Sequence, residues 1–436
     1  MKKITIIGTG YVGLVSGAGL AEFGHSVSCV DIDQEKIKNL NNGQIPIHEP
    51  GLDIIVKNNV KEGRLTFSSN IEKNIQEAKI IFIAVGTPQD EKGIADLTAV
   101  KSVVKLIADN LNNYKIICTK STVPIGTGKW IESEIKSRAS NDNFDYVSNP
   151  EFLREGAAVN DFLYPDRIVL GSLSEKAYSE MREIYRPLYI NKTPIIETSV
   201  ETAEMIKYAS NSFLALKISY INEIANLCEA VGADIHQVAR AMGQDGRISS
   251  KFLHPGPGFG GSCFPKDLAA LYSLGKEKNI DLNTVSATIK TNKSQKKRIT
   301  DKLSHLLNNK VKNKKIAILG LSFKPNTDDI RESASLNIVS NLIDLGADLS
   351  VYDPAAMKNF KSVYPNINYN DNWRDCVKNA DACVVLTEWN EFRGIDLSEL
   401  KTLLKSPILL DAKNIFSIKK LKNLEYSYDN IGRNSI

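Results

Sequence analysis

The chain has 436 residues, of which 42% are hydrophobic and 24% are charged, and its formal net charge is +4. This length exceeds what one core usually covers, so we expect two or three domains in a globular protein. The small net charge argues against nucleic-acid binding, and no apolar run approaches the roughly 20 residues that a membrane span needs. The six cysteines show no CxxC pair, which favours the reducing cytoplasm and suggests no metal site.

The first part of the chain alternates strand-like runs with helical patterns. The predicted strands are residues 4–7, 27–30, 80–85, 115–118 and 145–147. Such alternation is typical of a parallel, doubly wound sheet.

Between the first two predicted strands, residues 8–13 have the sequence GTGYVG. Gly8 permits a tight turn, Gly10 lets the backbone approach a pyrophosphate, and Gly13 allows close packing of helix and strand. Asp31 follows the second predicted strand, where a carboxylate binds ribose hydroxyls and repels a 2′-phosphate, so NAD is favoured over NADP. The alternative is a glycine-rich turn with an aspartate that caps a helix.

The middle of the chain is predicted to be helical. Apolar residues recur at helical spacing from 199 to 232, which predicts one long helix, and a second helical section covers 286–307. The strand pattern then resumes at 315–319, 348–352, 382–386 and 408–410. We therefore predict an α/β protein with two Rossmann-like, doubly wound domains joined by a long central helix.

Cys263 lies in a glycine-rich turn, whereas the other five cysteines lie in apolar or helical contexts typical of buried structural residues. Small neighbours let a ligand approach a thiol. A thiolate that adds to an aldehyde makes its carbon tetrahedral, so a second hydride can leave and a thioester remains for water to open. A thiol beside a dinucleotide motif therefore predicts a four-electron oxidation of an alcohol to an acid.

Two further pairs of residues are candidates for chemistry. Lys207 and Asn211 share one face of the predicted helix, where they either stabilise an oxyanion or form a solvated surface. Glu151 and Glu155 also share a face if a helix starts after Pro150. They then either perform acid–base work or complement the helix dipole. The residues alone leave both alternatives open.

Taken together, these motifs resemble the UDP-glucose 6-dehydrogenases of the UDP-glucose/GDP-mannose dehydrogenase family. The matching segments are residues 8–13, 30–33, 49–52, 85–88, 121–124, 149–156, 259–267 and 323–333, and the likeness continues to about Asn414. The loop sequence SCFPKD favours members that act on UDP-glucose over those that act on an N-acetylmannosamine sugar. The resemblance implies that a homodimer oxidises UDP-glucose to UDP-glucuronate and consumes two NAD.

The resemblance also implies roles for individual residues. The catalytic residues would be Cys263, Lys207, Asn211, Asp267, Thr122, Glu151 and Glu155. The NAD-binding residues would be Gly8, Gly10, Tyr11, Val12, Gly13, Asp31, Lys36, Thr87, Thr122, Glu155, Lys266 and Arg331. The substrate-binding residues would be Glu151, Phe152, Leu153, Lys207, Asn211, Arg247, Phe252, Gly260 and Lys324.

Within this set, Glu151 and Thr122 would hold a water that assists proton removal and thioester hydrolysis, and Asp267 would orient the water and Lys207. Lys266 either favours the thiolate or points to solvent. Arg247 would reach the sugar diphosphate of the neighbouring subunit.

The implied domains are an NAD-binding domain (1–196), a central dimerisation region with the cysteine loop (197–310) and a UDP-binding domain (311–436). Two departures concern peripheral contacts: Ser249 and Lys413 stand where the family usually has glycine and arginine. The rival functions are a dehydrogenase of another nucleotide sugar, a two-electron β-hydroxyacid dehydrogenase, and a protein that binds NAD or a sugar nucleotide without catalysis.

Overall fold

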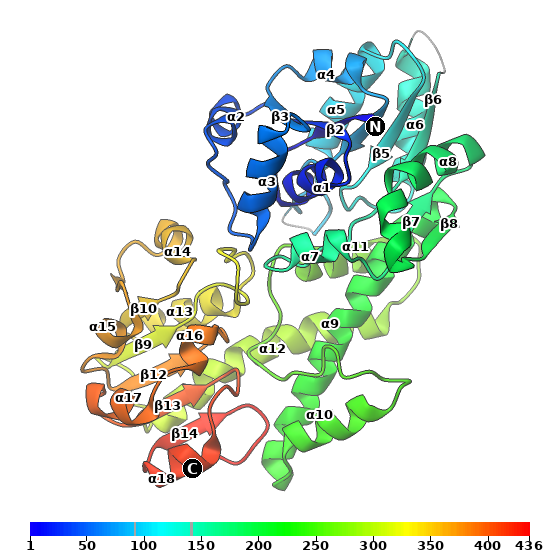
Figure 1. The fold of residues 1–436 in the computed structure, drawn as a ribbon. Coiled ribbons are helices and arrows are strands. Elements are labelled where there is room, and N and C mark those ends of the chain that lie inside the picture. The colour runs from blue at the N-terminus through cyan, green and yellow to red at the C-terminus, as the bar shows by residue number, and fades with distance from the viewer. Residues whose placement is uncertain (91–92, 140–142) are drawn as a thin grey trace. The chain divides into compact units, whose positions relative to one another are not determined.

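The computed structural model describes residues 1–90, 93–139 and 143–436. Within them the chain forms two compact units, Met1–Ser210 and Asn211–Ile436. Each unit contains one sheet flanked by helices, and helix α9 (Val200–Val231) begins in the first unit and ends in the second (Figure 1).

The first unit is built on an eight-stranded sheet with the order β3-β2-β1-β4-β5-β6-β7-β8. All neighbouring strands pair in parallel except β6 and β7. The strands are β1 Lys3–Ile7, β2 Ser26–Val30, β3 Leu65–Ser68, β4 Ile80–Ile83, β5 Lys115–Thr119, β6 Phe144–Ser148, β7 Ile168–Gly171 and β8 Ile195–Thr198. The order of the first six is that of a doubly wound nucleotide-binding fold, which places a ligand at the carboxyl ends of the strands.

The helices of this unit connect successive strands and bury apolar faces against the sheet. They are α1 Tyr11–Glu22, α2 Gln34–Asn41, α3 Leu52–Lys61, α4 Ile71–Glu77, α5 Thr98–Asp109, α6 Thr127–Arg138, α7 Ala158–Leu163, α8 Glu175–Ile184 and the 3₁₀ helix η1 Arg186–Asn191. Two buried clusters, one on each side of the strands, hold the layers together. Central strand residues such as Ile6, Phe82 and Cys118 are fully buried.

The second unit begins within α9 and continues through α10 (Ile235–Gln244), α11 (Phe264–Glu277) and α12 (Asn283–Leu306). Its sheet has the order β11-β10-β9-β12-β13-β14, and every neighbouring pair is parallel. The strands are β9 Lys315–Leu319, β10 Asp348–Tyr352, β11 Asn368–Tyr369, β12 Ala382–Val385, β13 Ile408–Asp411 and β14 Ser427–Asn430. The remaining helices are α13 Ala334–Asp344, α14 Met357–Val363, α15 Trp373–Val377, α16 Asn390–Arg393, α17 Leu397–Leu403 and α18 Ile418–Asn423.

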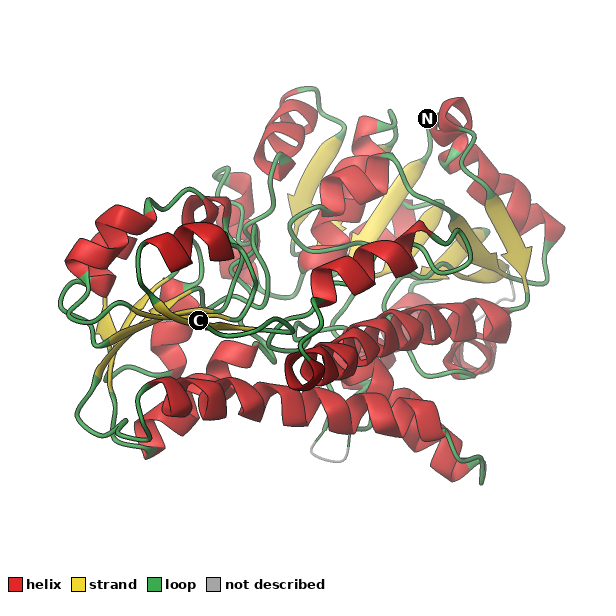
Figure 2. Cartoon of the chain, turned by 90° about the horizontal axis from the view of Figure 1, so that it is seen from below, coloured by secondary structure: helices red, strands yellow, loops and turns green. Residues whose placement is uncertain are grey.

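This second strand order repeats the doubly wound pattern, and Figure 2 shows helices on both faces of the sheet. The predicted fold class is therefore confirmed: two parallel-sheet α/β units are joined by a long helix. The division into three domains at residues 196 and 310 stays a prediction.

The predicted strands and the two long helices are present, with ends shifted by at most three residues. Five strands were not predicted: β3, β7, β8, β11 and β14. Four of them, β3, β8, β11 and β14, are short and contain polar residues, so their sequences lack an apolar run, whereas β7 is a short apolar segment that was missed. Among the described residues, no helix is long and apolar enough to cross a membrane.

Candidate active site

The glycine motif forms a sharp turn between β1 and α1. Gly8 has φ of 102°, and its N–H donates to the Val30 carbonyl at 2.8 Å. A β-carbon on Gly8 would lie 2.6 Å from the Ala84 carbonyl oxygen, and one on Gly13 would lie 1.9 Å from the Gly8 oxygen. No side chain fits at either position, so both glycines allow β1, α1 and the Ala84 backbone to pack closely, and the start of α1 favours a bound anion.

Asp31 lies immediately after β2, beside this turn. Its carboxylate accepts hydrogen bonds from the N–H and hydroxyl of Thr9 at 2.8 and 2.7 Å, and from the Lys36 ammonium at 3.2 Å. Desolvation opposes ionisation, but the hydrogen bonds from Thr9 and Asp33, together with the Lys36 charge, outweigh it and lower the pKa of Asp31. An ionised carboxylate at this place accepts ribose hydroxyls, so the turn and Asp31 fit NAD.

Glu151 and Lys207 form a buried ion pair in the first unit. The Lys207 ammonium donates to the Glu151 carboxylate at 2.9 Å and to the Glu151 carbonyl oxygen at 2.7 Å. It also lies 5.4 Å from the ring centre of Phe152, and the Arg167 guanidinium lies 3.7 Å from the same ring. The family-implied residues Glu151, Phe152 and Lys207 are thus in direct contact.

The helical prediction for Glu151 and Glu155 is wrong, because residues 151–156 form a loop. The Glu151 carboxylate accepts from the Leu153 N–H at 2.5 Å. The Glu49 carboxylate accepts from the N–H groups of Gly156 and Ala158, at 2.6 and 2.8 Å. These carboxylates take backbone donors that a longer helix would use, so α7 starts only at Ala158 and the two glutamates share no helical face.

Thr122 lies in the loop between β5 and α6, where its carbonyl accepts from the Thr87 hydroxyl at 2.8 Å. The N-terminus of α6 is held by Glu204 of α9. Its two carboxylate oxygens accept from the N–H groups of Gly126 and Gly128 at 2.6 and 2.8 Å. Burial raises the pKa of Glu204 to about 7, although these two hydrogen bonds favour its charged form.

A buried lysine, Lys120, lies next to this group of residues. Its ammonium donates to the Asn149 side-chain oxygen at 3.1 Å and to the Tyr185 hydroxyl at 3.5 Å. Desolvation lowers the pKa of Lys120 to about 8. Neither Lys120 nor Glu204 was predicted to belong to the site. Their only signal in the sequence is a charged residue within an apolar pattern, which also occurs on ordinary solvated faces.

Cys263 immediately precedes α11 in the second unit. It is half-buried, whereas the other five cysteines are buried. The N–H of Asp267, one turn later, donates to the Cys263 carbonyl at 2.8 Å. The start of a helix favours a negative charge, so this position suits a thiolate.

Asp267 is buried, and two of the predicted site residues donate hydrogen bonds to it. Its carboxylate accepts from the Asn211 amide at 2.6 Å and from the Lys266 ammonium at 2.8 Å. Asn211 follows Lys207 by four residues on α9, so the two share one face of this helix. The second unit therefore brings together Asn211, Asp267 and Lys266 next to the cysteine.

The cysteine loop leaves no room for larger side chains. Gly261 has φ of 82° and donates to the Arg331 carbonyl at 2.8 Å, and a β-carbon on Gly260 would lie 2.3 Å from the Glu332 carbonyl oxygen. Phe252 has φ of 66°, and its ring centre lies 6.1 Å from that of Phe264. The loop and the segment around Arg331 are therefore packed backbone against backbone.

Other predicted binding residues lie nearer the surface. Arg247 and Arg331 each pair with a neighbouring carboxylate, Asp245 and Asp329, at 2.6 Å. Lys324 lies 5.2 Å from the ring centre of Phe323. Each of these cations thus has a partner in the same loop.

The two departures from the family pattern have structural consequences. Ser249 has φ of 66°, which is the left-handed region that glycine occupies without strain. Lys413 makes one ion pair, with Glu388 at 2.8 Å, where an arginine could form a two-pronged contact. In the described part of the chain, no cluster of three or more His, Cys, Asp or Glu side chains is arranged to hold a metal.

The chain matches three domains of one family. They are the NAD binding domain over residues 2–189, the central domain over 201–294 and the UDP binding domain over 317–418 of the UDP-glucose/GDP-mannose dehydrogenase family. It is 48% identical to UDP-glucose 6-dehydrogenase TuaD of Bacillus subtilis (strain 168), a match that covers 100% of this chain and 94% of the relative. It is 47% identical to UDP-glucose 6-dehydrogenase of Rhizobium meliloti (strain 1021), over 99% of both chains.

Among solved structures, a UDP-glucose dehydrogenase from the hyperthermophilic archaeon Pyrobaculum islandicum is similar, with a TM-score of 0.92 and 32% identity over 99% of this chain and 98% of that one. The shared fold agrees with the turn at Gly8 and with Asp31, both of which fit a dinucleotide without a 2′-phosphate. The chain belongs to the UDP-glucose/GDP-mannose dehydrogenase family and uses NAD as its cofactor.

Proposed function

We propose that this chain is a UDP-glucose 6-dehydrogenase, which oxidises UDP-glucose to UDP-glucuronate and consumes two NAD. The observation that carries the proposal is a half-buried thiol at the start of α11 in a chain 48% identical to an enzyme of that name. A two-electron dehydrogenase has no need of a nucleophile, whereas oxidation beyond the aldehyde needs one.

NAD, when bound, accepts a hydride in each of two oxidations. The residues of this chain supply the remaining chemistry. Lys207 and Asn211 stabilise the negative charge that develops on the oxygen of the reacting carbon. The Cys263 thiolate then adds to the aldehyde and forms a thiohemiacetal, whose oxidation leaves a thioester on the same sulfur. Glu151 accepts a proton, and with Thr122 it holds the water that opens the thioester to the acid.

The same proposal covers the remaining predicted residues. The turn from Gly8 to Gly13 holds the pyrophosphate of NAD, with Asp31 at the ribose. Lys324 and the loop that contains Phe252 and Gly260 hold the UDP-sugar. Support for Lys324 comes from the match of residues 317–418 to the family's UDP binding domain, and the loop lies within the match of residues 201–294 to its central domain.

We also propose that the protein acts as a homodimer in the cytoplasm. The support for a dimer is a row of exposed apolar residues on α9, namely Phe213, Tyr220 and Leu227, which recur every seven residues. Arg247, whose side chain is 89% exposed, would then reach a neighbouring subunit.

The decisive experiment measures NADH formed per molecule of limiting UDP-glucose and identifies the product by mass. We expect two NADH and UDP-glucuronate from the native protein, whereas Cys263→Ala should form no UDP-glucuronate and at most one NADH per sugar. Cys228→Ala, which removes a buried cysteine, serves as the control and should keep both products. One NADH per sugar from the native protein would contradict the thiol mechanism. Faster oxidation of GDP-mannose or of a UDP-N-acetylhexosamine would contradict the substrate.

A further inference from the structure

Helix α12 contacts the backbone of the cysteine loop through buried side chains, chiefly that of Asn292. The Asn292 side-chain oxygen accepts from the Phe259 N–H at 2.8 Å, and its amide nitrogen donates to the Phe259 carbonyl at 3.0 Å. Asn292 is 8% exposed. Its side chain therefore satisfies both backbone groups of one residue, as a neighbouring strand would.

The loop can approach Asn292 only because Gly258 has no side chain. Gly258 has φ of 105°, and a β-carbon there would lie 2.6 Å from the Asn292 oxygen. Two further buried amides hold Gly256: Gln295 donates to its carbonyl at 2.9 Å, and Asn222 accepts from its N–H at 2.8 Å. The backbone before Cys263 is thus fixed at two points by side chains rather than by a sheet.

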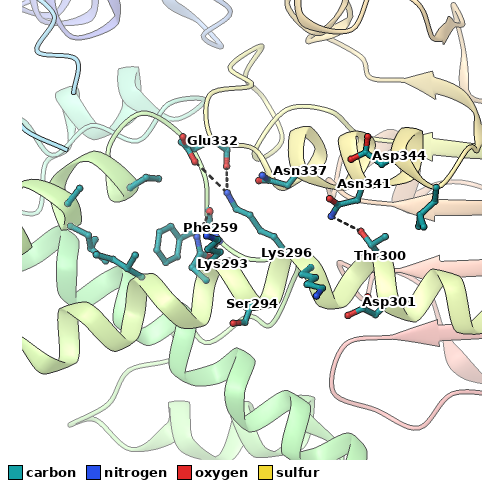
Figure 3. A pocket seen from close by; sticks show the side chains of 17 residues that line it. Phe259, Lys293, Ser294, Lys296, Thr300, Asp301, Glu332, Asn337, Asn341 and Asp344 are labelled. Atoms are coloured by element: carbon teal, nitrogen blue, oxygen red, sulfur yellow. Dashed lines mark hydrogen bonds and ion pairs between the residues drawn. The ribbon is translucent and has the colours of Figure 1, made fainter. Parts of the chain in front are cut away.

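One turn after Asn292, Lys296 holds a second loop. Its buried ammonium donates to the Glu332 carbonyl at 2.9 Å and lies 3.7 Å from the Glu332 carboxylate. Figure 3 shows Lys296 reaching from α12 to Glu332 at the edge of a cavity that Phe259 also lines. The residue before Glu332, Arg331, accepts from the Gly261 N–H, so the two loops are also bonded to each other.

We propose that Asn292 and Lys296 are positioning residues: Asn292 fixes the place of Cys263, and Lys296 fixes residues 323–333 beside it. Both side chains project from one face of α12, which thereby sets the distance between the thiol and the segment that carries Lys324 and Arg331. The inference rests on the proposed function for the role of Cys263 as a nucleophile. The hydrogen bonds themselves do not depend on that function.

The two residues should affect different kinetic constants. Asn292→Ala removes the partners of the N–H and carbonyl of Phe259, a buried residue, so the loop shifts. A displacement of the thiol by about 1 Å should lower kcat on the order of 10- to 100-fold, with the KM values for NAD and UDP-glucose nearly unchanged. Lys296→Met should instead raise both KM values about tenfold, and Lys296→Arg, which keeps a donor, should restore them.

Asn341→Ala is the matched control. Asn341 lines the same cavity and bonds α12 through the Thr300 hydroxyl at 3.4 Å, but its hydrogen bond involves neither loop. Its kinetics should equal those of the native protein. Equal losses of kcat in Asn341→Ala and Asn292→Ala would overturn the proposal, because a general loosening of the unit would then explain both.

A second readout does not need the enzyme reaction. Iodoacetamide should label the half-buried Cys263 before the five buried cysteines, and mass spectrometry of peptides locates the label. In Asn292→Ala the rate of labelling at Cys263 should rise, while the buried cysteines stay protected. An unchanged rate would overturn the proposal that Asn292 fixes the place of Cys263. If the native protein forms no NADH from UDP-glucose, the proposed function fails, but the labelling comparison still tests the positioning role of Asn292.

Discussion

Lys207 donates from one ammonium to two oxygens of the same residue, the carboxylate and the carbonyl of Glu151, at 2.9 and 2.7 Å. The two side chains are 4% and 5% exposed. Because both charges are buried, each helps to compensate the other, and the Leu153 N–H also donates to the Glu151 carboxylate. The catalytic role that we propose for the pair can therefore be separated from its contribution to stability.

Removal of one partner from such a pair costs about 3–5 kcal/mol, because the remaining charge stays buried without compensation. We expect Lys207→Met to lower the free energy of unfolding by about this amount. The double variant Lys207→Met with Glu151→Leu should recover much of the stability and remain inactive. Urea unfolding and NADH formation measure the two properties. Recovery of activity in the double variant would contradict the catalytic role.

Asp31 should determine the choice between NAD and NADP. Asp31→Asn removes the charge that repels a 2′-phosphate but keeps the size of the side chain. We expect the ratio of kcat/KM for NAD to that for NADP to fall about tenfold, or about 1.4 kcal/mol. Asp33→Asn is the control, because Asp33 caps α2 and its carboxylate accepts from the Lys36 N–H. A similar change in both variants would show that loss of any acidic residue in this loop suffices.

Lys120 should give the stability a distinct dependence on pH. The pKa of Lys120 is lowered by burial to about 8 in the folded protein, from 10.5. Between these values the unfolded chain binds more protons, so the contribution of Lys120 to stability rises with pH over this window. The charged or titratable groups near it are Cys118, Glu151, Lys207 and Tyr185.

In Lys120→Met this contribution disappears, while Tyr185 still donates to Asn149 at 2.7 Å. We therefore expect the free energy of unfolding of the native protein, minus that of the variant, to increase from pH 8 to pH 10. Urea titrations at intervals across this range provide the test. A constant difference would mean that the ordinary pKa of lysine is retained in the folded state.

The apolar row on α9 should determine the oligomeric state. Phe213 and Leu227 are 61% and 57% exposed, and a glutamate at either position would bury a charge in the proposed dimer contact. We expect Phe213→Glu to yield a monomer by light scattering after gel filtration. Leu173→Glu alters another large apolar residue, 89% exposed and outside α9, and should leave the dimer intact. A dimer in Phe213→Glu would place the contact elsewhere.

The sequence predicted the architecture because buried parallel strands form continuous apolar runs. The run at 80–85, for example, corresponds to β4, whose residues are all buried. The edge strand β8 was missed, because only two of its four residues are apolar and none is fully buried. Edge strands with one solvated face have no such run, so the sequence contains little that distinguishes them from loops.

The site was predictable only where spacing alone determines geometry. Lys207 and Asn211 share a face because residues 200–231 form one continuous helix. Glu151 and Glu155 share no helical face, because the Glu49 carboxylate accepts from the N–H groups of residues 156 and 158. Glu49 is about 100 residues away in the sequence, a separation over which local patterns are not informative. The positioning role of Asn292 could likewise not be predicted from the sequence, since its contacts with Phe259 depend on how α12 packs against the cysteine loop.

The charge state of the Glu204 carboxylate affects α6 as well as α9, the helix that carries it. Glu204 precedes Lys207 by three residues on α9, and it holds Gly126 and Gly128 at the start of α6, just after the loop that contains Thr122. A rotation of α9 that carried Lys207 away from Glu151 would therefore also pull on α6. The helix that carries Lys207 and the segment that follows Thr122 are thus connected through one carboxylate, that of Glu204.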